Sequence, residues 1–135
     1  MSPKELVKQF YENDLVKTKI EVHKFFHKDC ELHWNSSQGF QIMNYDDVFS
    51  FFKNINENYI SLRYENSHFL EEEDFVTTRY TVYGRTIEND DEETPLAHYI
   101  CIWQIKDGKL FKGHQISLPA NETTIQTNSF SEIKV

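Results

Sequence analysis

The dipeptide Asp107-Gly108 separates two segments, 97–106 and 109–118, in which apolar and polar residues alternate. Asp-Gly is a favoured connection of a two-residue β-hairpin, because such a turn needs positive φ angles that few other residue pairs tolerate. A turn of fixed length also fixes the pairing of the two strands, so Lys106 is predicted to face Lys109. The residue pairs farther from the turn are then predicted to face each other in the same register. This hairpin therefore constrains both the fold and the faces on which the later side chains lie.

The N-terminal part of the chain has a helical period instead. Residues 2–5 form a capping box with a proline at the first helical position, and residues 18–21 form a second box. A third helix is predicted to begin at Asn44, with Asp46 and Asp47 at the positive end of its dipole. The apolar residues of this third segment recur at the spacing of one helix face: Val48, Phe51, Phe52 and Ile55.

Strands are predicted in the remaining segments. Residues 30–34 can form a short strand, and a loop is expected at 35–40. Residues 61–70 and 75–87 alternate with a period of two, and the acidic residues 71–74 connect them. Helices followed by an antiparallel meander predict an α+β fold, with three N-terminal helices packed on one face of a mainly antiparallel sheet.

Length and composition agree with one domain. A chain of 135 residues is long enough for one hydrophobic core, and we place that domain at residues 1–119, followed by a polar C-terminal tail at 120–135. Aromatic residues make up 15% of the chain, which favours a packed core or an aromatic-lined cavity over disorder. Cys30 and Cys101 lie in hydrophobic surroundings and are expected to be buried free thiols.

The charge of the chain argues against several classes of partner. It has 22 acidic and 14 basic residues, for a net charge of −8 at pH 7, and no basic stripe. We therefore expect neither nucleic-acid nor membrane binding. No window is long and apolar enough to span a bilayer, and residues 1–10 lack the apolar core of a signal peptide, so a cytoplasmic location is expected.

Two histidines have a spacing that can bind a metal ion. His23 and His27 lie one helical turn apart, a separation that can ligate zinc on one helix face. No HExxH pattern accompanies them, so a solvated helix face is favoured, and neither a metal nor a cofactor is expected.

The hairpin pairing divides its side chains between two sheet faces. One predicted face holds His98, Ile100, Ile102, Gln104, Phe111, Gly113, Gln115 and Ser117. The other holds Tyr99, Cys101, Trp103, Ile105, Leu110, Lys112, His114 and Ile116. Both faces are rich in apolar residues, so we expect helices to cover one of them and a second subunit to cover the other.

Two stretches and the order of the elements resemble a known family. Residues 25–34 fit an apolar helix, a short turn with Asp and a strand, and residues 102–110 fit a strand, Asp-Gly-Lys and a strand. Over residues 3–118 this order is similar to the SnoaL-like branch of the nuclear transport factor 2 superfamily. The resemblance implies a cystatin-like cone, in which a strongly curved sheet holds a pocket between its concave face and the helices. It also implies a homodimer formed through the outer face.

The resemblance also indicates where a site would lie. Catalytic members of the family, among them steroid isomerases and epoxide hydrolases, carry acids at positions that correspond here to Trp34 and Gln115. Neither an indole nor an amide can act as a base at neutral pH, so those activities are disfavoured. The position of Gln115 makes the face with His98 and Ser117 the predicted concave face, and the opposite assignment stays open.

His98 is the candidate acid or base, because histidine titrates near neutral pH. Arg79, one strand over, would supply an anion partner; the alternative is that His98 binds backbone at a strand end and Arg79 pairs with a surface Glu. Trp34 and Asn35 are predicted at the pocket rim, where Trp34 would stack on a ligand, or else Trp34 belongs to the core. Tyr83 is a candidate for the pocket lining, an interface or the surface.

Three functions are compatible with these residues. The first is a binding protein that holds a small, largely apolar molecule, with the candidate ligand-binding residues Trp34, Asn35, Arg79, Tyr83, Gln115 and Ser117. The second is a cofactor-independent isomerase, cyclase or hydrolase that uses His98 as its acid or base. The third is a non-catalytic dimerisation module whose pocket is only core. Fold alone does not decide among them, since the family includes both enzymes and proteins without catalysis.

Overall fold

The structure is a computed structural model of the chain and describes residues 1–13, 21–88 and 91–120. The elements, in chain order, are α1 (Pro3–Glu12), α2 (Val22–Phe25), β1 (Phe26–Ser36), β2 (Gly39–Met43), α3 (Tyr45–Asn58), β3 (Tyr59–Glu72), β4 (Phe75–Thr86), β5 (Thr94–Lys106) and β6 (Lys109–Pro119). Helices precede the long strands of the meander, so the predicted α+β class is confirmed.

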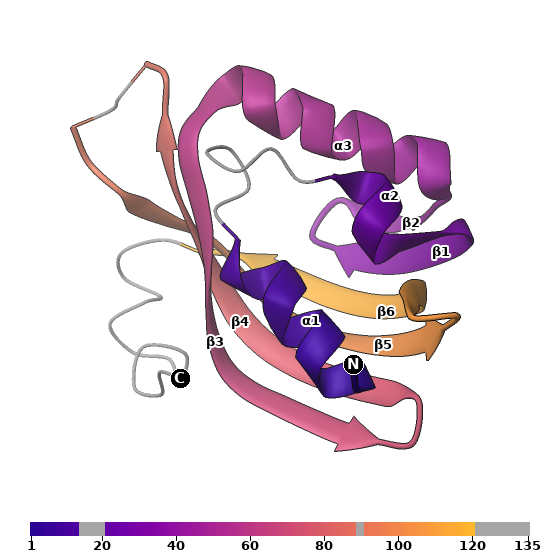
Figure 1. Ribbon diagram of the computed structural model, residues 1–135. Helices are drawn as coiled ribbons and strands as arrows, with labels where there is room; N and C mark the ends of the chain where they lie inside the picture. The colour runs from indigo at the N-terminus through magenta and orange to yellow at the C-terminus, as the bar shows by residue number, and fades with distance from the viewer. Residues whose placement is uncertain (14–20, 89–90, 121–135) are drawn as a thin grey trace.

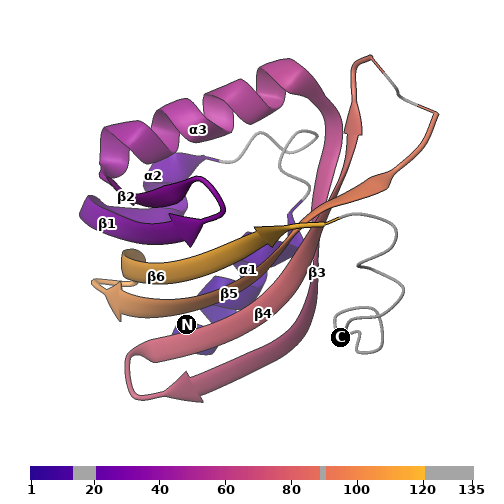
Figure 2. The ribbon, with the colours of Figure 1, turned by 180° about the vertical axis from the view of Figure 1, so that it is seen from behind.

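The strands form one curved sheet in the order β2-β1-β6-β5-β4-β3. β1 and β6 run parallel, and the other neighbours run antiparallel. The helices lie on the concave side of the sheet (Figure 1), and from behind no helix of the described chain crosses its outer face (Figure 2). This is the predicted mainly antiparallel sheet with helices on one face.

Irregularities in the strand pairing accompany the curvature of the sheet. The register shifts between Asn66 and His68 in β3, between Val82 and Tyr83 in β4, and beside Gln104 in β5. Extra residues of this kind bend a strand and increase its twist. The long strands therefore wrap around the helices rather than forming a flat layer.

Local capping signals set the first and third helices where the sequence predicts them. Ser2 is the N-cap of α1 and accepts a hydrogen bond from the backbone of Glu5. Asn44 and Asp47 form a reciprocal capping box at the start of α3. No helix among the described residues is long and apolar enough to cross a membrane.

The segment between these helices differs from the prediction. The second capping box lies mostly outside the described residues, and α2 is a single turn that ends before Phe26. The strand predicted at 30–34 is longer and begins at Phe26. The predicted loop at 35–40 instead contains a tight turn into β2, where Gly39 adopts a φ of 114° that L side chains rarely take.

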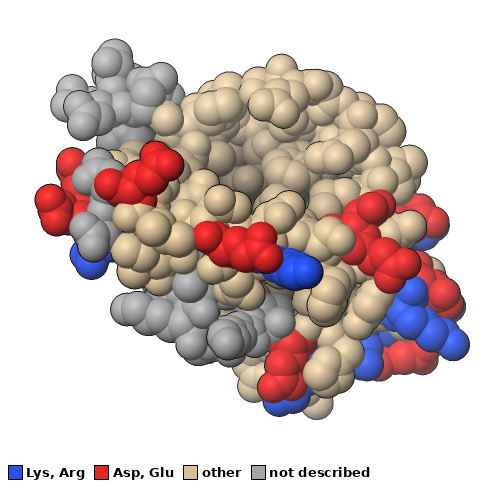
Figure 3. All heavy atoms as spheres, turned by 90° about the horizontal axis from the view of Figure 1, so that it is seen from above, with Lys and Arg blue, Asp and Glu red and all other residues tan. Residues whose placement is uncertain are grey.

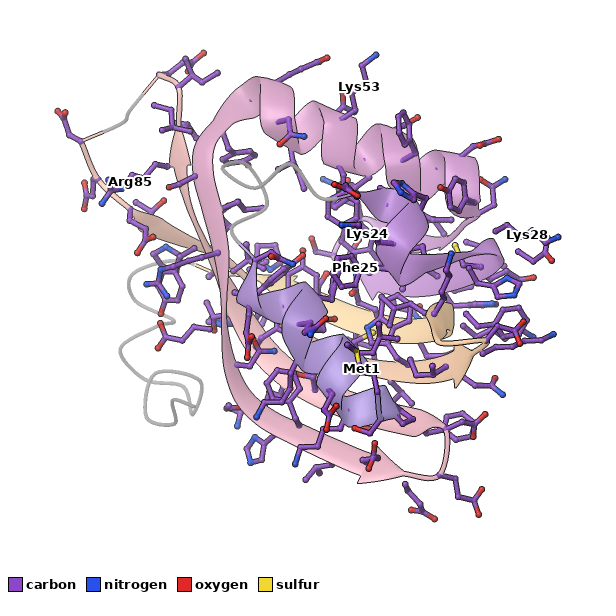
Figure 4. All side chains as sticks on the ribbon, viewed as in Figure 1. Met1, Lys24, Phe25, Lys28, Lys53 and Arg85 are labelled. Carbon is purple, nitrogen blue, oxygen red and sulfur yellow. The ribbon has the colours of Figure 1, made fainter. Side chains whose placement is uncertain are left out.

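The core lies between the concave face and the helices. Its most deeply buried apolar side chains are Val7 from α1, Val76 from β4, Cys101 from β5 and Leu110 from β6. The ring of Phe25, the last residue of α2, points toward α1 and contacts the Phe10 ring at a centroid distance of 5.5 Å (Figure 4). On α3, the side chain of Lys53 extends away from the sheet. Both cysteines are free and buried, as predicted.

The pairing of β5 with β6 corrects the predicted faces of the hairpin. Lys106 faces Lys109 and Ile105 faces Leu110 as expected, but Gln104 then faces Lys112. Phe111 is therefore an extra residue in β6, and a one-residue shift moves every later side chain of that strand to the other face.

The shift changes the partners of the candidate residues. Gln115 faces Cys101 and Ser117 faces Tyr99, so both lie on the concave face with the helices. His98 faces Leu118 and lies on the outer face. The predicted grouping of His98 with Gln115 and Ser117 is wrong, although Gln115 and Ser117 do lie on the concave side.

Candidate functional site

A cavity of about 70 Å³ lies between the concave face and the helices. From α1 it is lined by Phe10 and Tyr11, and from α3 by Val48, Phe51, Phe52 and Ile55. The sheet contributes, among others, Trp34, Tyr64, Tyr80, Tyr99, Trp103 and Gln115. The amphipathic stripe of α3 thus serves as the roof of the cavity. Seen from above, a hollow surrounded by uncharged residues is visible on the side that α3 helps to form (Figure 3).

Aromatic rings pack against one another around this cavity. Tyr80 and Tyr99 stack with their centroids 4.9 Å apart and an interplanar angle of 8°. At the rim, Trp34 meets Phe51 edge to face at 5.8 Å. Offset and edge-to-face ring pairs of this kind are favourable and geometrically specific. The cavity wall is therefore apolar and shaped by ring faces and ring edges.

Four side chains of the cavity lining, from Trp103 to Gln115, are joined in a hydrogen-bonded chain. The Trp103 indole N–H donates to the Tyr11 hydroxyl at 2.9 Å, and the Tyr11 hydroxyl donates to that of Tyr80 at 3.5 Å. The Tyr80 hydroxyl in turn donates to Gln115 Oε1 at 3.2 Å. Burial raises the pKa of Tyr11 and of Tyr80 well above the ordinary tyrosine value, so both remain protonated hydrogen-bond donors.

A separate hydrogen bond holds Trp34 at the rim. Its indole N–H donates to Ser117 Oγ at 2.8 Å, across the parallel pair of β1 and β6. Trp34 lies directly beside Gln115 in that pairing. Three of the predicted ligand-binding residues therefore lie together: Trp34 and Gln115 line the cavity, and Ser117 positions the indole of Trp34.

The other predicted site residues lie on the outer face. His98 is only 4% exposed, and its Nδ1 lies 2.8 Å from Thr81 Oγ1. Burial, and then the charge of Arg79, lowers the pKa of this histidine. Arg79 lies one strand over, opposite Ile100, and also points away from the cavity. The predicted convergence of His98 and Arg79 on a ligand in the cavity therefore has no support in the geometry.

Tyr83 and Asn35 are likewise outside the cavity. The guanidinium of Arg63 lies 4.5 Å from the centre of the Tyr83 ring and binds Glu93 through two nitrogens, at 2.9 and 2.8 Å. Glu93 directly precedes β5, and Arg63 lies in β3. Their ion pair therefore holds the start of β5 against β3. Asn35 faces Ile116 on the outer side of the sheet. Neither Tyr83 nor Asn35 lines the cavity, so their role in ligand binding stays a prediction.

The prediction from sequence missed three aromatic residues that line the cavity. Tyr11, Tyr99 and Trp103 were not assigned to a pocket, although their chemistry gave a signal. A buried tyrosine or tryptophan needs a partner for its O–H or N–H, and such residues on an apolar face indicate a polar contact inside the core. Among the described residues, no group of three His, Cys, Asp or Glu side chains could hold a metal ion.

Comparison with known families identifies the group to which this architecture belongs. The model of the SnoaL-like domain matches residues 7–112. The chain belongs to the SnoaL-like family. No curated protein sequence matches this SnoaL-like chain.

Solved structures share the SnoaL-like fold with this chain. IdmH, a putative polyketide cyclase from Streptomyces antibioticus, superposes with a TM-score of 0.70 at 12% identity, over 93% of this chain and 96% of IdmH. A phenazine biosynthesis-related protein from Pseudomonas aeruginosa gives 0.68 at 12% identity, over 95% and 81%. TerC, co-crystallised with polyporic acid, gives 0.57 at 18% identity, over 85% and 91%. At these identities the similarity shows the fold alone.

Proposed function

We propose that this SnoaL-like protein binds a small, largely apolar molecule in the cavity between the curved sheet and the helices. The observation that carries the proposal is the lining: ring faces and aliphatic side chains surround one polar corner at Gln115. Ligand sites in proteins commonly combine an apolar wall with a few placed polar groups. That TerC was co-crystallised with polyporic acid supports small-molecule binding as a use of this fold.

The size of the cavity limits the ligand. An apolar cavity of about 150 Å³ admits benzene, whereas the present cavity measures about 70 Å³. A single-ring ligand therefore needs a modest movement of the wall. Trp34, Phe51 and Tyr99 are only half-buried, so their rings are the lining groups with most room to rotate.

Binding fits the lining better than acid–base catalysis. None of the described lining residues is an Asp, Glu, His, Lys or Arg. The ionisable groups that do line the cavity are tyrosines, and burial raises the pKa of Tyr99 to about 12. General acid–base catalysis works best with a group whose pKa lies near the working pH. The alternative of an isomerase, cyclase or hydrolase that depends on His98 therefore receives no support from the cavity.

The experiment is a titration with toluene, followed by tryptophan fluorescence. The chain contains two tryptophans, and both Trp34 and Trp103 line the cavity. Toluene is expected to change their emission saturably and to raise the midpoint of thermal unfolding. Val82→Phe places a ring in the cavity and should abolish both effects, at a cost of about 1–3 kcal/mol of stability. Thr77→Phe, which puts the same ring on the outer face of the same strand, should bind toluene like the wild type.

Equal responses of wild type and Val82→Phe would contradict the proposal, because the bound toluene would then lie elsewhere. A wild type that shows neither a saturable fluorescence change nor thermal stabilisation would contradict it as well.

We also propose that two copies of the chain associate through the outer face. On that face Ile100 lies directly opposite Ile116, with Ile102 and Leu118 adjacent, and all four side chains are exposed. These four residues form the outer patch. Exposed apolar patches on neighbouring strands usually mark an interaction surface. A second copy is the occupant that supplies the same apolar surface in return, as a two-fold interface requires.

A further inference from the structure

The hydrogen-bonded chain of the cavity has a direction. It starts at Trp103, whose indole nitrogen carries a proton and has no lone pair to accept with. The Tyr11 oxygen must therefore be the acceptor of that bond, which is 2.9 Å long. The Tyr11 hydroxyl hydrogen is then left to donate onward.

Two acceptors are available to the Tyr11 hydroxyl. One is the Tyr80 oxygen, and the other is the thiol of Cys101, which also contacts Tyr11. Sulfur is the weaker acceptor of the two. The bond therefore runs to Tyr80, and the Tyr80 hydroxyl donates in turn to the carbonyl oxygen of Gln115 at 3.2 Å.

This direction fixes the orientation of the Gln115 amide. Oxygen and nitrogen of a glutamine side chain are told apart by their hydrogen bonds, and here the oxygen is the atom that faces a donor. Gln115 is 7% exposed and lines the cavity, and its Nε2 has no hydrogen-bond partner among the described residues. Among the described residues, Gln115 Nε2 is not one of the fully buried polar atoms that lack a partner, so it is accessible from the cavity. An oxygen acceptor of a ligand placed there would pair N–H donors that no described protein group accepts.

We propose that Gln115 selects the ligand of this cavity by donating its side-chain N–H to an oxygen acceptor. The class is a small planar aromatic molecule with a carbonyl oxygen, its ring among the aromatic side chains and its oxygen toward Gln115 Nε2. A molecule that offers only a hydrogen-bond donor is rejected, because its N–H would face the N–H groups of Gln115. This inference rests on the proposed binding function.

Three probes and two variants test the inference by calorimetric titration. Acetophenone carries the carbonyl acceptor, ethylbenzene is similar in shape and lacks it, and pyrrole offers an N–H donor alone. Gln115→Met keeps the length of the side chain and removes its donors. It should weaken acetophenone binding by about tenfold relative to ethylbenzene. Comparing variants probe by probe removes the difference in hydrophobicity between the probes.

Tyr80→Phe tests the direction of the chain. Without the Tyr80 hydroxyl, the amide oxygen of Gln115 is free to turn into the cavity. The preference for acetophenone over pyrrole should then fall several-fold, with pyrrole gaining affinity. A preference that is unchanged in Tyr80→Phe would overturn the inferred orientation.

A measurement on the wild type keeps the inference testable if a variant fails to fold. In a ¹⁵N-labelled protein, the side-chain NH₂ signals of Gln115 should shift downfield with acetophenone and not with ethylbenzene. If both probes bind but these signals respond alike, and Gln115→Met weakens both probes equally, the selectivity of Gln115 is wrong and the binding function stands. If none of the probes binds, the binding function is wrong and the inference fails with it.

Discussion

The indole N–H of Trp103 on β5 donates to the hydroxyl of Tyr11 on α1, which joins the concave face of the sheet to the first helix. Trp103 is only 2% exposed, so water cannot replace this acceptor. Tyr11 in turn connects to Tyr80 and hence to Gln115. The contact that fixes the helix on the sheet is thus also the start of the polar chain in the cavity.

Removing the Tyr11 hydroxyl should be costly. Tyr11→Phe leaves the indole N–H of Trp103 buried without a partner, which typically costs about 1–3 kcal/mol. The measurement is the free energy of unfolding in urea. Tyr64→Phe is the matched control, because Tyr64 also lines the cavity and its hydroxyl has no hydrogen bond to the described residues. Equal losses in the two variants would show that the Trp103 bond contributes nothing specific.

Gly113 should not tolerate even one methyl group. A Cβ at this position would lie 2.6 Å from Trp103 Cζ3 and 2.8 Å from Leu32 Cδ1. Gly113→Ala must therefore displace Trp103, a ring that also lines the cavity, and is expected to destabilise the protein by about 1–3 kcal/mol. Urea unfolding measures the loss, and a shift in tryptophan emission should accompany it. Wild-type stability and emission in Gly113→Ala would contradict the packing described at this position.

The stability of the protein should depend on the protonation of His98. Burial, and then the charge of Arg79, lowers the pKa of His98 from the usual 6.5. The unfolded chain therefore binds this proton more readily than the folded one, and stability is lost as the pH falls below about 6.5. His98→Gln should show a flatter decline of the unfolding free energy between about pH 7 and about pH 5. His23→Gln, at an exposed site, is the control and should keep the wild-type slope. Identical slopes in all three proteins would remove His98 as the cause.

The outer patch should control self-association. Ile116→Glu puts a charge at the centre of the four-residue patch, and sedimentation at micromolar concentration is expected to show a dimer for the wild type and a monomer for this variant. Phe49→Glu, at an exposed position of α3 on the side of the sheet that the helices cover, is the control and should remain dimeric. A monomeric wild type would contradict the proposed assembly without affecting the binding proposal.

The parts of the fold that local sequence signals encode could be predicted. The caps at Ser2 and Asn44 satisfy backbone groups within a few residues of themselves, so the starts of α1 and α3 follow from the sequence. The Asp107-Gly108 turn likewise placed the first pairs of the hairpin correctly. β2 was missed because most of its side chains are exposed and give no burial pattern.

The extra residue at Phe111 could not be read from the hairpin itself. Its ring packs edge to face on His27, 5.1 Å between centroids, near the start of β1. His27 also lies 3.3 Å from Asp107 in the turn. This distant contact, rather than the local alternation, accompanies the register shift that moved His98 away from Gln115.

Only part of the candidate site could be predicted, because its residues are brought together by contacts between distant segments. Trp34 and Gln115 were identified through the family resemblance, which carries spatial information that the alternation lacks. Tyr11 and Trp103 are 92 residues apart in the chain, and only the folded structure shows that they share a hydrogen bond. How these two residues are used depends on tertiary contacts that no local pattern records.

The most direct test of the account is to locate a bound small molecule by NMR. With toluene in excess, intermolecular nuclear Overhauser effects are expected between its protons and the methyl groups of Val48 and Val82, which line the cavity from α3 and β4. Contacts only to the methyl groups of Ile100 and Ile116, on the outer face, would contradict a binding site in the cavity.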